Sequence, residues 1–189
     1  MIIENNVINE LIINKSKFIT YLYKVKSIDE FNIYLNNLKE KYKDATHICY
    51  AYIIDNNQKF NDDFEPNGTA GMPILDVLKK NNLNYIACFV IRYFGGIKLG
   101  AGGLVRAYSN SCSQALKMTN LETIQKKFKI KITVSYNENS ILEKIITNKN
   151  IINVSYQDNV TYNLLITEFE KEKIDYYKFN YQVIEETKF

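Results

Sequence analysis

Several residue types that build special sites are scarce in this chain of 189 residues. It has no tryptophan, one histidine, two prolines and seven glycines, and its three cysteines are an odd number with no Cys-x-x-Cys pair. This cysteine pattern excludes a disulfide framework, and we predict that all three are reduced core thiols. One histidine without paired cysteines also makes a zinc-type ligand set improbable, so we predict no metal and no cofactor.

Long apolar runs and strong charge imbalance are absent as well. No segment approaches the roughly 18 apolar residues that a membrane helix needs, and no basic segment precedes an apolar block at the start, so we predict a soluble, cytoplasmic protein without membrane contact. The net charge of +3 excludes a polyanion binder of the histone type but leaves room for a local basic patch. The 46% hydrophobic content is that of an ordinary globular protein, which at this length buries about 70% of its surface.

The residues that remain informative are concentrated in one segment. Every glycine and both prolines lie within residues 66–103, and the two arginines are Arg92 and Arg106. Lysine replaces arginine almost everywhere else, so these two arginines mark positions where a forked guanidinium is needed. Glycine permits positive φ or close approach, and we therefore expect function in this segment.

Hydrophobic periodicity divides the chain into two parts. In the first part it predicts strands at 7–13, 17–25, 46–55 and 85–92, with a helix capped by Ser27 and Glu30, a second from Pro73 to about Lys80, and a third after the glycine-rich turn. From about residue 126 it predicts strands at 128–136, 151–157, 160–166 and 178–184, and helices at 140–149 and 168–176. This second pattern is βαββαβ, the ferredoxin-like order, and the boundary lies at 120–126.

Three segments resemble the YigZ/IMPACT family, namely ATHICYAY (45–52), DDFEPNGTAGMPIL (62–75) and RYFGGIKLGAGGLVRAY (92–108). The resemblance covers residues from about 15 to 118. It departs at Phe64, where the family usually has glycine, and this argues against a tight glycine turn in the acidic loop.

The resemblance implies an α+β protein of two domains. Residues 1–122 would form a domain like the second domain of ribosomal protein S5, and residues 126–189 a ferredoxin-like domain similar to elongation-factor-G domain V. Both analogies point toward RNA and the ribosome. The family's eukaryotic relatives are associated with restraint of the amino-acid-starvation signal to translation, and some bacterial relatives are named hydrolases or proline dipeptidases.

The glycine-rich loop at 95–103 follows a buried strand and opens a helix, a context in which backbone N–H groups can hold an anion. It matches neither the P-loop nor the GxGxxG pattern. The candidate phosphate-binding or RNA-binding residues are Arg92, Lys98, Arg106, Gly100, Gly102 and Gly103, with a weaker second set of Gly68, Thr69 and Gly71. The alternative is that these glycines only permit close packing.

An acidic cluster precedes that loop. Asp62, Asp63 and Glu65 could act as general acids or bases together with His47, or could be solvated, or could pair with Arg92 or Arg106. The alternative for His47 is a hydrogen-bonded histidine at the core or its rim. Of the aromatic residues near the arginines, Tyr93 could stack on a base, whereas we expect Phe94 and Tyr108 in the core.

The sequence therefore favours a protein that binds RNA or a ribosome-associated surface and modulates translation without covalent chemistry. The main alternative is a hydrolase of a small phosphorylated or peptide-like substrate that uses the cluster of Asp62, Asp63 and Glu65. A third possibility is a protein-interaction module that docks through the sheet of the second domain. Whether the protein is an enzyme stays open at this stage.

Overall fold

The computed structural model describes residues 1–187, which form two compact units. The N-terminal unit is Met1–Thr123 and the C-terminal unit begins at Ile124. Each contains a sheet with helices packed on it, which confirms the predicted α+β class. No helix within residues 1–187 is both long and apolar enough to cross a membrane.

The N-terminal unit is built on a five-stranded antiparallel sheet in the order β2-β3-β6-β4-β5. Its strands are β2 (Val7–Ile13), β3 (Ser16–Lys24), β4 (His47–Ile54), β5 (Asn57–Asn61) and β6 (Ile86–Tyr93). The central strand β6 is buried along almost its entire length, because helices cover both faces of the sheet. This burial explains why β6 reads as a continuous apolar run rather than an alternating one.

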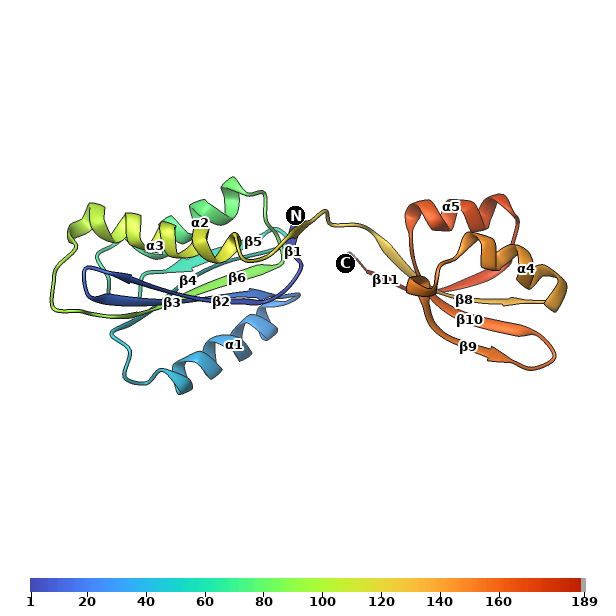
Figure 1. Ribbon diagram of the computed structural model, residues 1–189, viewed down its shortest axis with the longest axis horizontal. Helices are drawn as coiled ribbons and strands as arrows, with labels where there is room; N and C mark the ends of the chain where they lie inside the picture. Colours follow the sequence, from blue (N-terminus) through green and yellow to red (C-terminus); the bar gives the residue numbers. More distant parts are fainter. Residues whose placement is uncertain (188–189) are drawn as a thin grey trace. The chain divides into compact units, whose positions relative to one another are not determined.

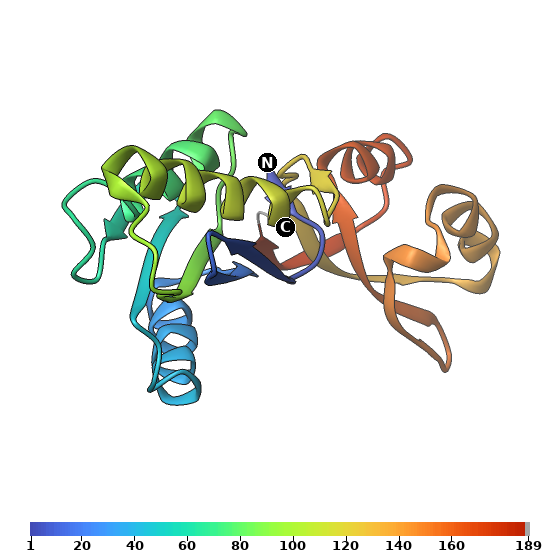
Figure 2. The ribbon, with the colours of Figure 1, turned by 60° about the vertical axis from the view of Figure 1, so that its left-hand side comes forward.

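Three helices pack on this sheet. Figures 1 and 2 show α1 (Ile28–Lys41) on one face, and α2 (Gly71–Lys80) and α3 (Gly100–Leu116) together on the other. The predicted cap of α1 is confirmed, since Ser27 Oγ accepts a hydrogen bond from the Glu30 amide. The main core lies under α2 and α3 and includes Phe18, Ile74 and Tyr108.

All three cysteines lie in this core. Cys49, Cys88 and Cys112 are free thiols without exposed surface, as predicted. Desolvation by burial raises the pKa of the Cys49 and Cys88 thiols. Since the thiolate is the reactive form, neither group is suited to nucleophilic chemistry.

A short two-stranded ribbon joins the two ends of the N-terminal unit. Strand β1 (Ile2–Ile3) pairs antiparallel with β7 (Leu121–Glu122), and Ile3 is fully buried. Neither strand is predicted from the sequence, because two residues are too few to show a period.

The C-terminal unit has the predicted βαββαβ order. It consists of β8 (Lys127–Val134), α4 (Tyr136–Ile145), a 3₁₀ turn (Asn148–Asn150), β9 (Ile151–Tyr156), β10 (Val160–Thr167), α5 (Glu168–Tyr176) and β11 (Tyr181–Thr187). The sheet order β11-β8-β10-β9 is the ferredoxin-like arrangement, with α4 and α5 on one face (Figure 1). The predicted start of α4 at 140 is wrong, because Ser135 and Glu138 form a capping box that begins the helix at Tyr136.

Candidate functional site

A buried ion pair lies where β6 ends. Arg92 is 5% exposed, and its Nη1 donates a hydrogen bond of 2.5 Å to Glu65 Oε1. The Tyr108 hydroxyl donates to the same oxygen at 2.8 Å. No donor from residues 1–187 reaches the other carboxylate oxygen, Oε2, although the Glu65 side chain is only 3% exposed. Glu65 is thus a largely buried carboxylate in which Oε1 is bonded twice within the protein and Oε2 keeps some accessible surface.

This geometry corrects the predicted role of Arg92. Its guanidinium is bound inside the protein to Glu65, and Nη2 reaches the buried Ser16 hydroxyl at 3.4 Å, so Arg92 is not a phosphate contact. The alternative that an acidic residue pairs with Arg92 is confirmed. Arg106 behaves differently, because it lies on the exposed side of α3. The two arginines therefore have different surroundings.

His47 is the cross-strand neighbour of Arg92, at the start of β4. Its Nδ1 lies 2.7 Å from the Asp63 carbonyl oxygen, which can only accept, so Nδ1 carries the proton and Nε2 of the neutral ring is an acceptor. Nε2 lies 3.8 Å from Glu65 Oε1, beyond hydrogen-bond distance. His47 thus lies at the rim of the core, as one prediction proposed, with a free ring nitrogen.

Asp62 explains the second glycine segment. Its carboxylate accepts hydrogen bonds from the backbone amides of Gly68 at 2.9 Å, Ala70 at 3.0 Å and Gly71 at 2.8 Å. The predicted phosphate site at Gly68, Thr69 and Gly71 is therefore wrong, because the chain's own carboxylate already holds these amides. Thr69 turns away from it and donates to the Pro66 carbonyl. The anion at the start of α2 is therefore the Asp62 carboxylate of the protein itself.

Asp63 also has a structural function. Its Oδ2 accepts a 2.6 Å hydrogen bond from the Ile48 amide, and this bond ties the acidic loop to β4. Asp62 and Asp63 thus hold the acidic loop in place, and the acid/base function considered for them stays a prediction. Among residues 1–187, no group of three His, Cys, Asp or Glu side chains is placed to hold a metal ion.

Phe64 forms the tip of the acidic loop and is 97% exposed. Its φ is +66° and that of Asp63 is +42°, both in the left-handed region that favours glycine. The expectation that a bulky residue here prevents a glycine-type turn is wrong. The loop keeps that conformation because the side chains of Asp62 and Asp63, directly before the tip, bind the backbone amides of Gly71 and Ile48.

Replacing Phe64 by glycine is expected to raise the free energy of unfolding by about 1 kcal/mol, because an L-residue with this φ is strained and the ring packs on nothing. Urea denaturation measures this change. Phe94→Gly is the matched control: Phe94 is partly exposed without positive φ, and its variant should lose stability. A Phe64→Gly variant that is also less stable than the parent would show that the loop is not strained.

The glycines of the 95–103 loop fall into two classes. Gly95 lies so close to the β2–β3 turn that a Cβ atom would overlap the Lys15 backbone, and its amide donates to Ser16 Oγ at 3.2 Å. Gly95 therefore serves packing, which was the alternative interpretation. Ser16 was missed as a site residue, although it lies within the part of the chain that resembles the family; its Oγ contacts both Gly95 and Arg92.

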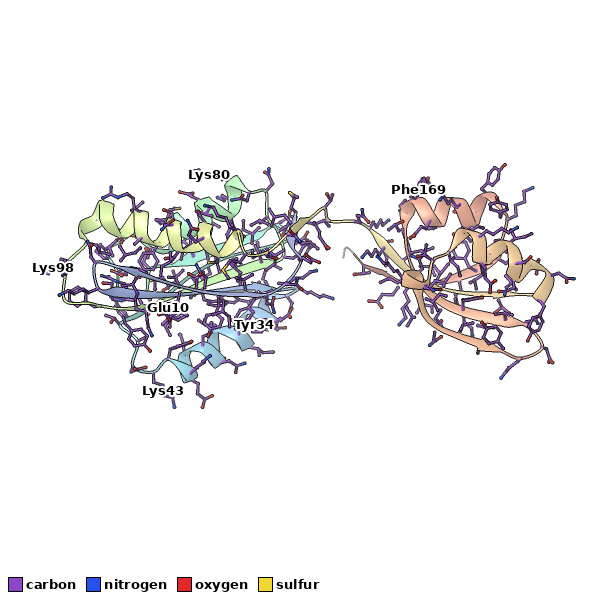
Figure 3. All side chains as sticks on the ribbon, in the orientation of Figure 1. Glu10, Tyr34, Lys43, Lys80, Lys98 and Phe169 are labelled. Atoms are coloured by element: carbon purple, nitrogen blue, oxygen red, sulfur yellow. The ribbon has the colours of Figure 1, made fainter. Side chains whose placement is uncertain are left out.

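The first backbone N–H groups of α3 are not capped by a side chain. Gly100 has a φ of +69°, and the N-cap residue Leu99 makes no side-chain hydrogen bond to the helix. The first N–H groups of a helix have no intrahelical partner, so those of Gly100, Ala101 and Gly102 remain available. The N–H of Gly103 is the first that can bond within the helix. Lys98 on the preceding loop (Figure 3) and Arg106 on α3 are both exposed.

A cavity of about 470 Å³ lies between the ion pair and the start of α3. Its lining residues come from the start of β4 and the residue before it, the acidic loop, the end of β6, the loop into α3 and α3 itself: Thr46, His47, Glu65, Pro66, Arg92, Phe94, Lys98, Leu99, Gly100, Ala101 and Leu104. Phe94 is 46% exposed, so the expectation that it is a core residue is wrong, whereas Tyr108 is fully buried as expected. Burial raises the pKa of the Tyr108 hydroxyl.

The cavity brings together only some of the predicted residues. The predicted residues that line it are His47, Glu65, Arg92, Lys98 and Gly100, whereas Gly103 and Arg106 line a separate hollow of about 680 Å³ between α3 and the β2–β3 turn. Tyr93 lines neither, and its hydroxyl donates to Asp44. The α3 start thus has a cavity on one side and an arginine on the other.

Comparison with known proteins identifies similar chains. The Impact N-terminal domain matches residues 14–116. The chain is 50% identical over 111 residues to the IMPACT family member YvyE of Bacillus subtilis, which is 57% of this chain and 51% of that protein. It is 34% identical over 152 residues to the IMPACT family member YigZ of Escherichia coli, covering 77% of this chain and 74% of that protein.

One solved structure extends the likeness over both units. A crystal structure described as that of a hypothetical protein matches with a TM-score of 0.63 at 29% sequence identity. It covers 96% of this chain and 94% of that chain. The alignment to YvyE, by contrast, spans only about half of that relative's length.

Proposed function

Because this chain belongs to the IMPACT family, we propose that it binds RNA, or a ribosome-associated RNA surface, through the start of α3 and thereby modulates translation. The observation that carries this proposal is the open first turn of α3, flanked by the exposed cations Lys98 and Arg106. Phosphate oxygens are the anions that such a turn suits.

Electrostatics around α3 supports phosphate binding. The N-terminal end of a helix carries a partial positive charge, and Lys98 and Arg106 add two full charges beside it. Glu65 is the carboxylate that lines the neighbouring cavity, but its charge is offset by Arg92 at 2.5 Å. An approaching phosphate therefore meets a surface of net positive charge.

Aromatic and apolar surface lies next to these charges. Phe94 is 46% exposed and Ile97 is 42% exposed, both on the loop that leads into α3. Proteins that bind single-stranded RNA combine a basic track with exposed rings on which bases stack. The loop offers both within a few residues, which favours a single-stranded segment over a duplex.

A salt titration tests the proposal. The full chain should bind a single-stranded 12-nucleotide RNA with log K falling linearly against log salt, and the Lys98→Ala/Arg106→Ala double variant should reduce the slope by about 1.4, since each lost phosphate contact on a single strand is worth about 0.7. Fluorescence anisotropy at four salt concentrations measures both quantities.

The matched control is Lys43→Ala/Lys80→Ala. Figure 3 shows these exposed lysines beyond α1 and at the end of α2, away from Lys98. This pair should leave the slope within about 0.3 of the parent value. A flat slope for the parent chain, or an equal loss in both double variants, would rule out the start of α3 as the RNA site.

A hydrolase is the second candidate, and it now depends on fewer residues. Asp62 and Asp63 are bound to backbone amides, so acid/base chemistry would depend on Glu65 and His47, which both line the cavity. Docking of a protein partner on the C-terminal sheet stays a prediction. The face opposite its helices carries Lys129, Lys131 and Thr133, and this polar set lacks the apolar centre of a stable interface.

A further inference from the structure

Two hydrogen-bond acceptors without donors lie on one wall of the cavity. One is Glu65 Oε2, in a side chain that is 3% exposed, and the other is His47 Nε2, whose ring carries its proton on the opposite nitrogen. Every other strong bond of the two groups is satisfied within the protein: Glu65 Oε1 by Arg92 and Tyr108, and His47 Nδ1 by the Asp63 carbonyl.

A ligand that fills the cavity must supply donors to this pair. Glu65 Oε2 is not fully enclosed, so it is open to water when the cavity holds no ligand. A ligand that displaces this water without replacing its hydrogen bonds loses affinity. Among residues 1–187 no side chain or backbone group donates to Oε2, so the donors must come from the ligand. Two neighbouring N–H donors on one edge of the ligand meet this requirement.

Guanine is the RNA base with that edge. Its N1–H and its N2 amino group lie side by side, whereas adenine and cytosine place a ring acceptor beside their amino group and uracil flanks its N3–H with two carbonyl oxygens. Discrimination of this kind is strong, because a base with an acceptor at that position would leave Glu65 both buried and repelled.

The other walls fit the rest of a nucleotide. Phe94 offers a partly exposed ring for stacking, and Leu99 and Leu104 supply apolar contact. Lys98 and the Gly100 amide lie at the α3 side, where a phosphate would meet the open helix turn. The volume of about 470 Å³ is in the range of small-ligand sites.

We propose that this cavity binds a guanosine 5′-phosphate unit, with the guanine edge on Glu65 and His47 and the phosphate on Lys98 and the start of α3. The inference rests on the proposed function in that the guanosine belongs to an RNA strand; a free guanine nucleotide has the same chemistry, and the experiment separates the two sources.

Calorimetric titration of the full chain with mononucleotides tests the base edge without changing the protein. 5′-GMP should bind, 5′-IMP, which lacks the N2 amino group, should bind about 10-fold more weakly, and 5′-AMP about 100-fold more weakly. Guanosine without phosphate should bind about 10-fold more weakly than 5′-GMP. The inference is overturned if 5′-GMP does not bind at millimolar concentration, or if all three nucleotides bind within threefold of one another.

The Glu65→Gln variant tests the proposed contact between the Glu65 carboxylate and the base edge. The amide keeps an oxygen for Arg92 and Tyr108 but places an N–H₂ donor where Oε2 stood, so the preference should reverse toward 5′-AMP. Glu10→Gln, a surface variant on β2 (Figure 3), is the control and should keep the parent preference. A folded Glu65→Gln chain that still prefers 5′-GMP would contradict the assignment.

An RNA arm separates this inference from the proposed function. A uridine 12-mer that contains one guanosine should bind about 10-fold more tightly than the same strand with adenosine at that place. Equal, salt-dependent binding of both strands would leave the proposed function standing and remove the guanine site. Selectivity among mononucleotides without any RNA binding would assign the cavity to a free guanine nucleotide and remove the proposed RNA function.

Discussion

Replacing Arg92 by alanine is expected to lower the free energy of unfolding of the N-terminal unit by about 3–5 kcal/mol. The change leaves the buried Glu65 carboxylate with only the Tyr108 hydroxyl as a donor. It also removes the guanidinium from the faces of Phe18 and Phe94, at 5.5 Å and 5.6 Å from the ring centroids. This is one of the two largest effects that we expect from a single substitution.

Arg106→Ala is the matched control, since it removes the chain's other arginine from an exposed position on α3. Its effect should stay below about 0.5 kcal/mol. Urea unfolding of the full chain gives both values, and hydrogen exchange of the β6 amides assigns the transition to the N-terminal unit. If both variants lose the same stability, Arg92 is not held in a buried ion pair.

Gly95→Ala is expected to destabilise the N-terminal unit by about 3 kcal/mol, because the added Cβ overlaps the Lys15 backbone and neither segment can give way as a side chain would. The backbone displacement that relieves this overlap also lengthens the hydrogen bond from the Gly95 amide to Ser16 Oγ. Ser16 is in turn a hydrogen-bond partner of Arg92. Thermal unfolding of the full chain reports the loss.

Gly102→Ala is the control for this variant. Gly102 lies in the first turn of α3, and a Cβ there would meet only the Arg106 side chain at an ordinary 3.7 Å. Alanine favours a helix over glycine by about 1 kcal/mol, so this variant should be somewhat more stable than the parent. Equal destabilisation by both alanines would mean that Gly95 is not in close contact with the β2–β3 turn.

Much of the fold could be predicted from the sequence, because most elements carry a period long enough to be recognised. The alternation in residues 128–134 and the apolar run before Arg92 both predicted strands, and the structure places β8 and β6 there. Strands of two residues, such as β1 and β7, are too short to show a period. Their strand conformation depends on the hydrogen-bonded pairing between them.

The site was harder to predict, because identical residue types have different functions after folding. Arg92 and Arg106 are indistinguishable as sequence, yet one faces the core from a buried strand and the other faces solvent from a helix. Asp62, Asp63 and Glu65 lie within four positions, but their partners come from residues 48, 68–71 and 92. Which of these carboxylates faces the cavity depends on the folded conformation of the loop, and the order of residues alone does not show it.

Backbone strain was the least predictable feature. Phe64 adopts a left-handed φ that residue preferences would assign to glycine. The residue preference fails here because hydrogen bonds from distant backbone amides to the Asp62 and Asp63 carboxylates hold the turn. They impose on Phe64 a conformation that phenylalanine does not favour. Such exceptions are expected near functional sites, where the surrounding structure imposes a conformation.

The β1–β7 ribbon also brings the two ends of the N-terminal unit together. Because residues 2–3 and 121–122 are hydrogen-bonded neighbours, the polypeptide enters and leaves the unit at one point on its surface. A module with adjoining entry and exit can be fused to other domains or permuted without opening its sheet. Recombination between genes could therefore transfer such a unit intact, with its cavity, into proteins of quite different length.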